Sequence, residues 1–160
     1  MTRNFNDAKL NGATAGKGGK PADWQELNLS GKSIVSLEGL EQCLQLKCLD
    51  LSVNDIDAIA PICSLPHLEK LHAQRNPFMD FSALKKLKSL KELHLGGSWV
   101  DYDVGEHTLE SYGPAWGPTV TTKVLAHLVP LKNLQTLAFY NHGLLSLHQL
   151  NKLPKLKRLE

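Results

Sequence analysis

The sequence is poor in the residues that mark several classes of protein. Only 6% of its 160 residues are aromatic, and it has three cysteines. No two of Cys43, Cys48 and Cys63 have the two-residue gap of a zinc knuckle or a redox site, and the number suits a reducing compartment. No stretch approaches the 18 consecutive apolar residues of a membrane helix, and the N-terminus lacks the apolar segment of a secretory signal. We therefore expect a cytoplasmic protein with no membrane partner.

Leucine, by contrast, is in excess, with 30 copies in 160 residues. Hydrophobic residues make up 42% of the chain and charged residues 21%, a balance that excludes a wholly disordered protein. A chain of this length is one domain of ordinary size and can bury a core. Such a skew toward one residue type usually has a periodic cause.

The leucines follow a 22-residue period. Apolar residues occupy positions 1, 4, 6, 11, 14, 17 and 20 of units that start at Trp24, Leu46, Leu68 and Leu134. A further unit starts at Leu90 and is interrupted, and a last one starts at Leu156. In the second unit the residues are Leu46, Leu49, Leu51, Ile56, Ile59, Ile62 and Leu65.

The spacing within a unit predicts its structure. Alternating apolar residues at positions 4 and 6 are typical of a short strand with one buried face. The later intervals of three fit a tight helical return on the opposite side. One unit cannot bury its own apolar row, so stacked units must share a core. We expect an α/β repeat solenoid, with a short parallel sheet on the concave side and 3-10 or α-helical returns on the convex side.

The pattern resembles the leucine-rich repeat in its 22-residue subclass. The stretch from Leu46 to Leu65, with Asn54 at position 9, shows the likeness best, and it covers residues 24–160. Regulatory subunits of protein phosphatases and several bacterial proteins use this subclass. The resemblance implies a concave sheet that is presented to protein partners. Position 9 is Lys32, Ser98 or His142 in other units, so we expect no unbroken asparagine ladder.

Three regions depart from the period. Residues 1–23 are rich in glycine and lysine and are expected to form a flexible tail or a partial cap. The interrupted unit is twice the usual length, so residues 99–122 are either a weak repeat or, as we favour, an inserted loop. The last residues end on a strand, which allows a monomer or a dimer formed through the sheet edge.

Positions 3, 5 and 7 of each unit should face the concave side. Neighbouring strands lie about 4.8 Å apart, so the residues at position 5 should form a column. That column reads Asn28, Asp50, His72 and His94. Its mixed polarity suits specific hydrogen bonding with a protein. Beside it on the same face we expect the partner-binding residues Lys70, Gln74, Glu92 and Tyr140.

Asp50, His72 and His94 are also the best candidates for chemistry, with Glu92 nearby. Two imidazoles and a carboxylate are plausible metal ligands. Side chains that stand parallel on a sheet do not converge easily, however, and no nucleophile elbow or oxyanion hole is evident. We therefore predict no metal, no cofactor and no catalytic residue. The lysines near residue 88 flank leucines and do not form a large positively charged surface, which nucleic-acid binding would need. We therefore expect no nucleic-acid partner.

Residues 99–122 differ in composition from the rest of the chain. The segment has four acidic residues and no lysine or arginine, whereas residues 123–160 have six basic residues and one acidic residue. Tryptophan and tyrosine often anchor interfaces because they bury a large area at small entropic cost. We expect partner contacts from Trp99, Asp101, Tyr102, Asp103, Tyr112 and Trp116.

These observations favour a protein-binding module that is not an enzyme. Within that class the acidic aromatic segment suggests a stoichiometric inhibitor or an immunity-type protein, whose partner would be an enzyme or a toxin. The alternatives are a metal-dependent or enzymatic site at Asp50, His72 and His94, and a structural module that oligomerises through its sheet edge.

Overall fold

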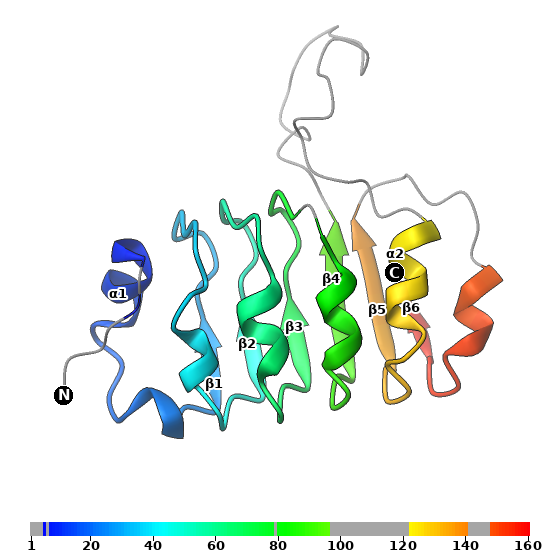
Figure 1. Ribbon diagram of the computed structural model, residues 1–160, viewed down its shortest axis with the longest axis horizontal. Helices are drawn as coiled ribbons and strands as arrows, with labels where there is room; N and C mark the ends of the chain where they lie inside the picture. The colour runs from blue at the N-terminus through cyan, green and yellow to red at the C-terminus, as the bar shows by residue number, and fades with distance from the viewer. Residues whose placement is uncertain (1–4, 6, 79, 97–121, 141–147) are drawn as a thin grey trace, which may run out of the picture.

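The chain forms a single stack of repeating units. The structure is a computed structural model that describes residues 5, 7–78, 80–96, 122–140 and 148–160, without the side chains of Thr122, Lys123 and Tyr140. Figure 1 shows the strands side by side along the molecule, with the helical segments on one face of the sheet. This arrangement confirms the predicted α/β solenoid. Its strands are β1 (Glu26–Asn28), β2 (Cys48–Asp50), β3 (Lys70–His72), β4 (Glu92–Gly96), β5 (Thr136–Tyr140) and β6 (Arg158–Leu159).

The sheet is parallel throughout and its strands follow chain order from β1 to β6. Leu27 pairs with Leu49 and Leu49 with Leu71, so the register advances by one period at each step. Between β4 and β5 it advances by two periods, because Leu93 pairs directly with Leu137. No strand lies between β4 and β5 in the sheet. Residues 97–121, which hold most of the interruption, lie outside the described residues.

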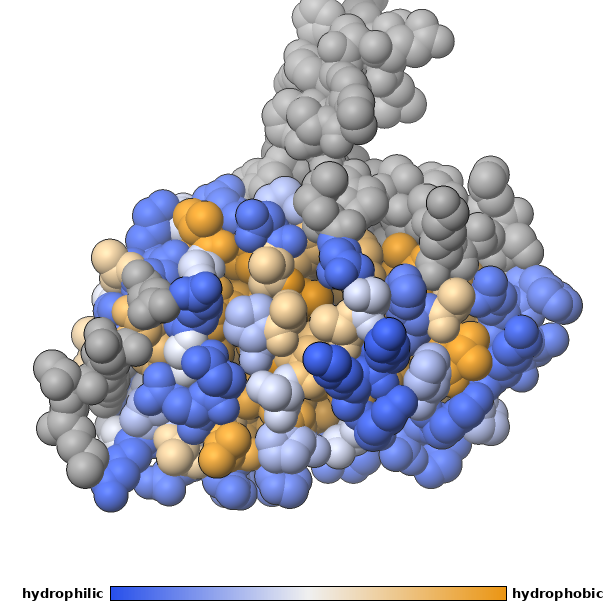
Figure 2. Space-filling model, in the orientation of Figure 1, coloured by the Kyte–Doolittle hydropathy of each residue, from blue (hydrophilic) through white to orange (hydrophobic). Residues whose placement is uncertain are grey.

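The returns lie on one face of the sheet, as the intervals of three predicted. Figure 2 shows this face, where hydrophilic residues line the lower right border, over the C-terminal units. In the region that the structure describes, no helix is both long enough and apolar enough to cross a bilayer. The returns are η2 (Leu40–Gln42), η3 (Ala60–Ser64), η4 (Ser82–Lys86), α2 (Thr122–Leu128) and η7 (His148–Lys152).

The core is built from the periodic apolar residues. Each of the seven predicted positions is buried in the units that start at Trp24, Leu46 and Leu68. Burial is weaker near the C-terminal edge, where Leu156 is half-buried and Leu159 is 44% exposed. Leu159 lies in the edge strand, where only one neighbouring strand packs against it.

Two asparagines tie successive units together at position 9. The Asn54 side chain is fully buried; its Nδ2 donates to the carbonyls of Leu29, Leu51 and Ser52, and its Oδ1 accepts from the amides of Lys32 and Ile34. Asn76 repeats the arrangement one unit later and is half-buried. A buried amide side chain here satisfies backbone groups that the turn leaves unpaired.

The residue before each turn, at position 8, has a left-handed backbone. The φ angles of Gly31, Val53 and Arg75 are 65°, 59° and 57°. Glycine adopts this conformation freely, but a β-branched residue such as Val53 is strained in it. The sequence carries no clear signal of this requirement, because only one of the three positions is glycine.

An N-terminal segment covers the first unit. Helix α1 (Ala8–Thr14) is followed by a 3-10 turn, η1 (Pro21–Asp23), and Phe5 and Leu10 join the core beside Trp24. Asp7 accepts hydrogen bonds through Oδ1 from the first turn of α1, and through Oδ2 from the amides of Val35 and Ser36 in the first unit. This carboxylate therefore joins the N-terminal segment to the stack.

Candidate functional site on the concave face

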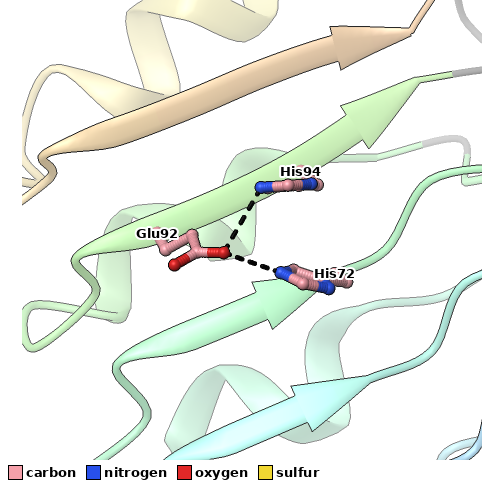
Figure 3. Close-up of side chains that lie close together, drawn as sticks. All are labelled: His72, Glu92 and His94. Carbon is pink, nitrogen blue, oxygen red and sulfur yellow. Dashed lines mark hydrogen bonds and ion pairs between the residues drawn. The ribbon is translucent and has the colours of Figure 1, made fainter. Parts of the chain in front are cut away.

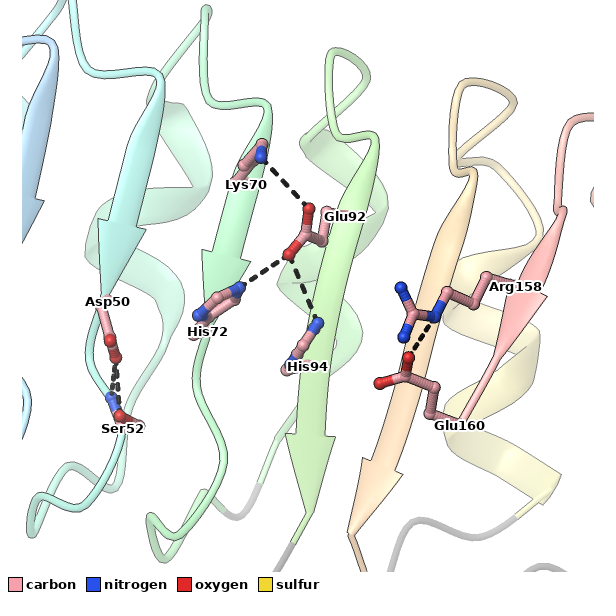
Figure 4. Close-up of polar contacts among 8 residues, drawn as sticks. All are labelled: Asp50, Ser52, Lys70, His72, Glu92, His94, Arg158 and Glu160. Atoms are coloured by element: carbon pink, nitrogen blue, oxygen red, sulfur yellow. Dashed lines mark hydrogen bonds and ion pairs between the residues drawn. The ribbon is translucent and has the colours of Figure 1, made fainter.

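The parallel register places the predicted column in a row across the sheet. Asn28 pairs with Asp50, Asp50 with His72, and His72 with His94. The residues beside them at position 4, such as Leu49, are buried, so the column residues lie on the opposite face from the core. Figure 4 looks onto this face, with the helices behind the strands.

Within the column, the two histidines and Glu92 form a cluster. His72 and His94 stack with ring centroids 4.2 Å apart. Glu92 Oε1 lies 2.9 Å from His72 Nε2 and 3.4 Å from His94 Nε2 (Figure 3). The other carboxylate oxygen, Oε2, lies 3.4 Å from Lys70 Nζ. Two adjacent strands thus aim two imidazole nitrogens at one oxygen.

The surroundings of the cluster shift two of its pKa values. The hydrogen bond from His72, with Lys70 adding to it, holds the pKa of Glu92 below its usual value even though burial raises it. Burial lowers the pKa of His94, and the neighbouring His72 lowers it further against the opposing effect of Glu92. The cluster therefore combines a stable carboxylate with an imidazole that favours its neutral form.

Asp50 does not belong to this cluster, although the sequence suggests it as a metal ligand together with His72 and His94. Its Oδ1 accepts hydrogen bonds from the backbone amide and the hydroxyl of Ser52, at 2.9 and 2.6 Å. Ser52 Oγ in turn lies 2.8 Å from Ser30 Oγ on the neighbouring unit. The short Asp50 side chain bonds to Ser52, two residues later, whereas the longer Glu92 side chain reaches the histidines.

A concave hollow of about 390 Å³ lies beside the cluster over β1, β2 and β3. Lys17, from the N-terminal segment, stands at its edge, with its Nζ 5.6 Å from the centroid of the Trp24 ring. Burial and the nearby Glu26 raise the pKa of the Cys48 thiol in the hollow. The polar residues that line it are Lys17, Glu26, Asn28, Asp50, Lys70 and His72.

The remaining predicted residues divide into two groups. Gln74 is half-buried beyond the end of β3, and its Oε1 has no hydrogen-bond partner among the described residues. Tyr140 ends β5, paired with Gly96, but its side chain is not described. The residues of the interruption, which lie outside the described residues, are Trp99, Asp101, Tyr102, Asp103, Tyr112 and Trp116.

Two features of the site were missed in the sequence. The sequence places Glu92 near the histidines but assigns the carboxylate between them to Asp50. The pattern Glu92-x-His94, with His72 one period earlier, puts all three on one face of adjacent strands. Lys17 had no periodic signal, because its position depends on the packing of the N-terminal segment.

Comparison with solved structures shows proteins of similar architecture. Internalin C2 of Listeria monocytogenes matches 98% of this chain at 22% identity with a TM-score of 0.69. A leucine-rich repeat protein of Leptospira interrogans matches 85% at 22% identity with a TM-score of 0.52. The plant peptide hormone receptor RGFR1, solved in complex with RGF2, matches 84% at 22% identity with a TM-score of 0.55. The chain spans 64%, 37% and 20% of these three chains, respectively.

Comparison of sequences gives a shorter match. Protein PAC2 of Saccharomyces cerevisiae is 33% identical over 87 residues, which cover 52% of this chain and 17% of that protein. No protein-family model matches the sequence.

Proposed function

The chain has the leucine-rich repeat fold, and on that basis we propose that it is a protein-binding module that holds its partner on the concave sheet. The observation that carries the proposal is the in-register row of polar side chains, Asn28, Asp50, His72 and His94, beside an open hollow. Such a row presents hydrogen-bonding groups at a fixed spacing of about 4.8 Å, which suits an extended or irregular protein surface.

The charges of the hollow favour a partner of mixed polarity. Lys17 and Lys70 stand among Glu26 and Asp50, so neither sign of charge dominates. A polyanion such as nucleic acid would need a larger surface of one sign. In the related fold, RGFR1 was solved with the peptide RGF2, which agrees with a peptide or protein ligand.

A narrower form of the proposal is that the chain is a stoichiometric inhibitor or immunity-type protein. It rests on residues 99–122, with two tryptophans, two tyrosines, four acidic residues and no lysine or arginine. An acidic segment with aromatic anchors could fill the basic cleft of an enzyme or a toxin.

The test of the proposed function is affinity capture from the native cell, followed by a binding measurement with the purified partner. A double variant, Glu26→Lys with Asn28→Lys, places two cations at the exposed edge of the hollow and should weaken binding at least tenfold. The matched control, Asp55→Lys with Asp57→Lys, alters the net charge more but lies outside the strands and the hollow. Equal loss in both variants, or loss only in the control, would overturn the concave-face proposal.

The inhibitor form is tested with the same partner. Activity of a captured enzyme or toxin should fall linearly as the chain is added and reach its minimum at one equivalent. Trp99→Ala with Trp116→Ala should raise the Kd at least tenfold while leaving the Tm nearly unchanged. A partner that keeps full activity when saturated would refute inhibition and leave the binding module intact.

A further inference from the structure

The cluster of His72, Glu92 and His94 can do more than contact a protein. We propose that these three residues form a binding site for one divalent transition-metal ion, zinc for preference, with an open coordination position facing the concave surface. The metal site shares His72 and His94 with the row of polar residues proposed to hold a partner, but its test does not depend on identifying that partner. It also revises the prediction from the sequence that the chain has no metal ligands.

The distances in the cluster fit the geometry of a zinc ion. The ligand atoms of a four-coordinate zinc ion, each 2.0–2.1 Å from the metal, lie about 3.3 Å from one another. Glu92 Oε1 lies 2.9 Å from one Nε2 atom and 3.4 Å from the other, and three possible ligand atoms lie within 4.8 Å of one another. An ion between them also requires the two stacked imidazole rings to turn, because each ring nitrogen must point at the metal.

The fold makes this convergence possible. His72 and His94 are direct register partners on β3 and β4, and Glu92 lies two residues before His94 on the same face. The glutamate side chain turns so that its carboxylate faces the Nε2 atoms of both histidines (Figure 3). The two histidines stand side by side and stack, as side chains on a sheet are expected to do. The glutamate is long enough to turn toward the adjacent strand and contact both.

The chemistry of the donors selects the class of metal. Two imidazoles and one carboxylate suit zinc and neighbouring transition metals, whereas calcium and magnesium prefer oxygen donors alone. A metal needs the imidazole nitrogen unprotonated. The His94 side chain is only 13% exposed, so little water competes for its ring nitrogen. Lys70 holds the second oxygen of Glu92, which leaves Oε1 as the oxygen that faces the histidines.

Burial of the cluster is intermediate, so an ion can enter and keep one position open. The His72 side chain is 33% exposed and that of Glu92 is 25% exposed. Three protein ligands with an open fourth position are typical of reactive zinc sites, while structural sites are closed by four ligands. Water or a donor group from another molecule would complete the coordination.

The test is isothermal titration calorimetry of zinc chloride into the full chain, carrying no histidine tag, in a non-chelating buffer at pH 7.5. We expect one site per chain, and a Kd raised at least thirtyfold by each of His72→Ala, Glu92→Gln and His94→Ala. Cobalt(II) in place of zinc should give visible absorption bands that the same variants abolish. Circular dichroism will show whether each variant is folded, and the more exposed His72 remains informative if His94→Ala unfolds.

Matched controls separate the site from casual binding to surface residues. His67→Ala and His148→Ala remove exposed histidines elsewhere, and Asp50→Asn tests the carboxylate that the structure directs toward Ser52. All three should bind zinc as the wild type does. A wild-type Kd above about 100 μM would overturn the proposal. So would His72→Ala and His94→Ala variants that bind zinc as tightly as the wild type does.

Discussion

Single side chains hold the units of the solenoid together where the backbone turns. Asn54 is fully buried and makes five hydrogen bonds to the backbone, two of them to amides of the preceding unit. Asn76 occupies the equivalent position in the next unit but is only half-buried. The same residue type in the same position therefore contributes unequally, because unpaired polar groups cost more when water cannot reach them.

We expect Asn54→Ala to lower the free energy of unfolding by about 2 to 4 kcal/mol, since it leaves several buried backbone groups unpaired. Asn76→Ala should cost less, about 1 to 2 kcal/mol, because water can replace part of what is lost. Urea unfolding followed by circular dichroism measures both. Equal losses would show that burial is not what distinguishes the two positions.

Val53 offers the opposite change, a substitution that stabilises. Its φ of 59° is unfavourable for a β-branched side chain, whereas asparagine tolerates the left-handed region. Val53→Asn should raise the free energy of unfolding by about 0.5 to 1 kcal/mol. Val35→Asn is the control, because Val35 is 50% exposed and is not among the residues with positive φ. A similar gain in both variants would argue against relief of strain.

At the scale of the element, helix α1 depends on one residue before its start. A helix of seven residues is too short to be stable alone, so it needs its cap and its packing on the first unit. Burial would raise the pKa of Asp7, but hydrogen bonds from the amides of Val35, Leu10, Ser36 and Lys9 together lower it. The folded protein therefore prefers the ionised carboxylate more than the unfolded chain does.

This preference makes the attachment of α1 sensitive to acid. Because the pKa of Asp7 is lower when folded, its stabilisation is present above its unfolded pKa of about 3.9 and is lost as the pH falls through the folded value. At pH 7, Asp7→Asn should lower the free energy of unfolding by about 1 to 2 kcal/mol, because the amide has one oxygen where the carboxylate uses two to accept hydrogen bonds. The difference from wild type should shrink below about pH 4. A stability difference between Asp7→Asn and the wild type that stays constant down to pH 2.5 would contradict the assignment.

At the scale of the whole molecule, the 22-residue period was enough to predict the architecture. It identified the buried residues and the strand register, and hence the column of Asn28, Asp50, His72 and His94. This works because a parallel stack repeats one geometry, so spacing in sequence becomes spacing in space.

The period could not predict how side chains bend or how non-repeating segments pack. Glu92 turns toward two histidines while Asp50 turns toward Ser52, and both outcomes depend on side-chain length and rotamer. Lys17 reaches the hollow only because α1 and η1 fold onto the first unit. Such features depend on local contacts that no periodic pattern records.

The strict register also means that the number of units between two residues determines whether they can act together. His72 and His94 meet because one period separates them. If one further unit were inserted between them, each unit would still pack on its neighbours through the same core positions. The two imidazoles would nevertheless lie about 9.6 Å apart, twice the usual strand spacing. Gain or loss of a repeat would then switch the chemistry of this surface on or off in one genetic step, without a single point mutation.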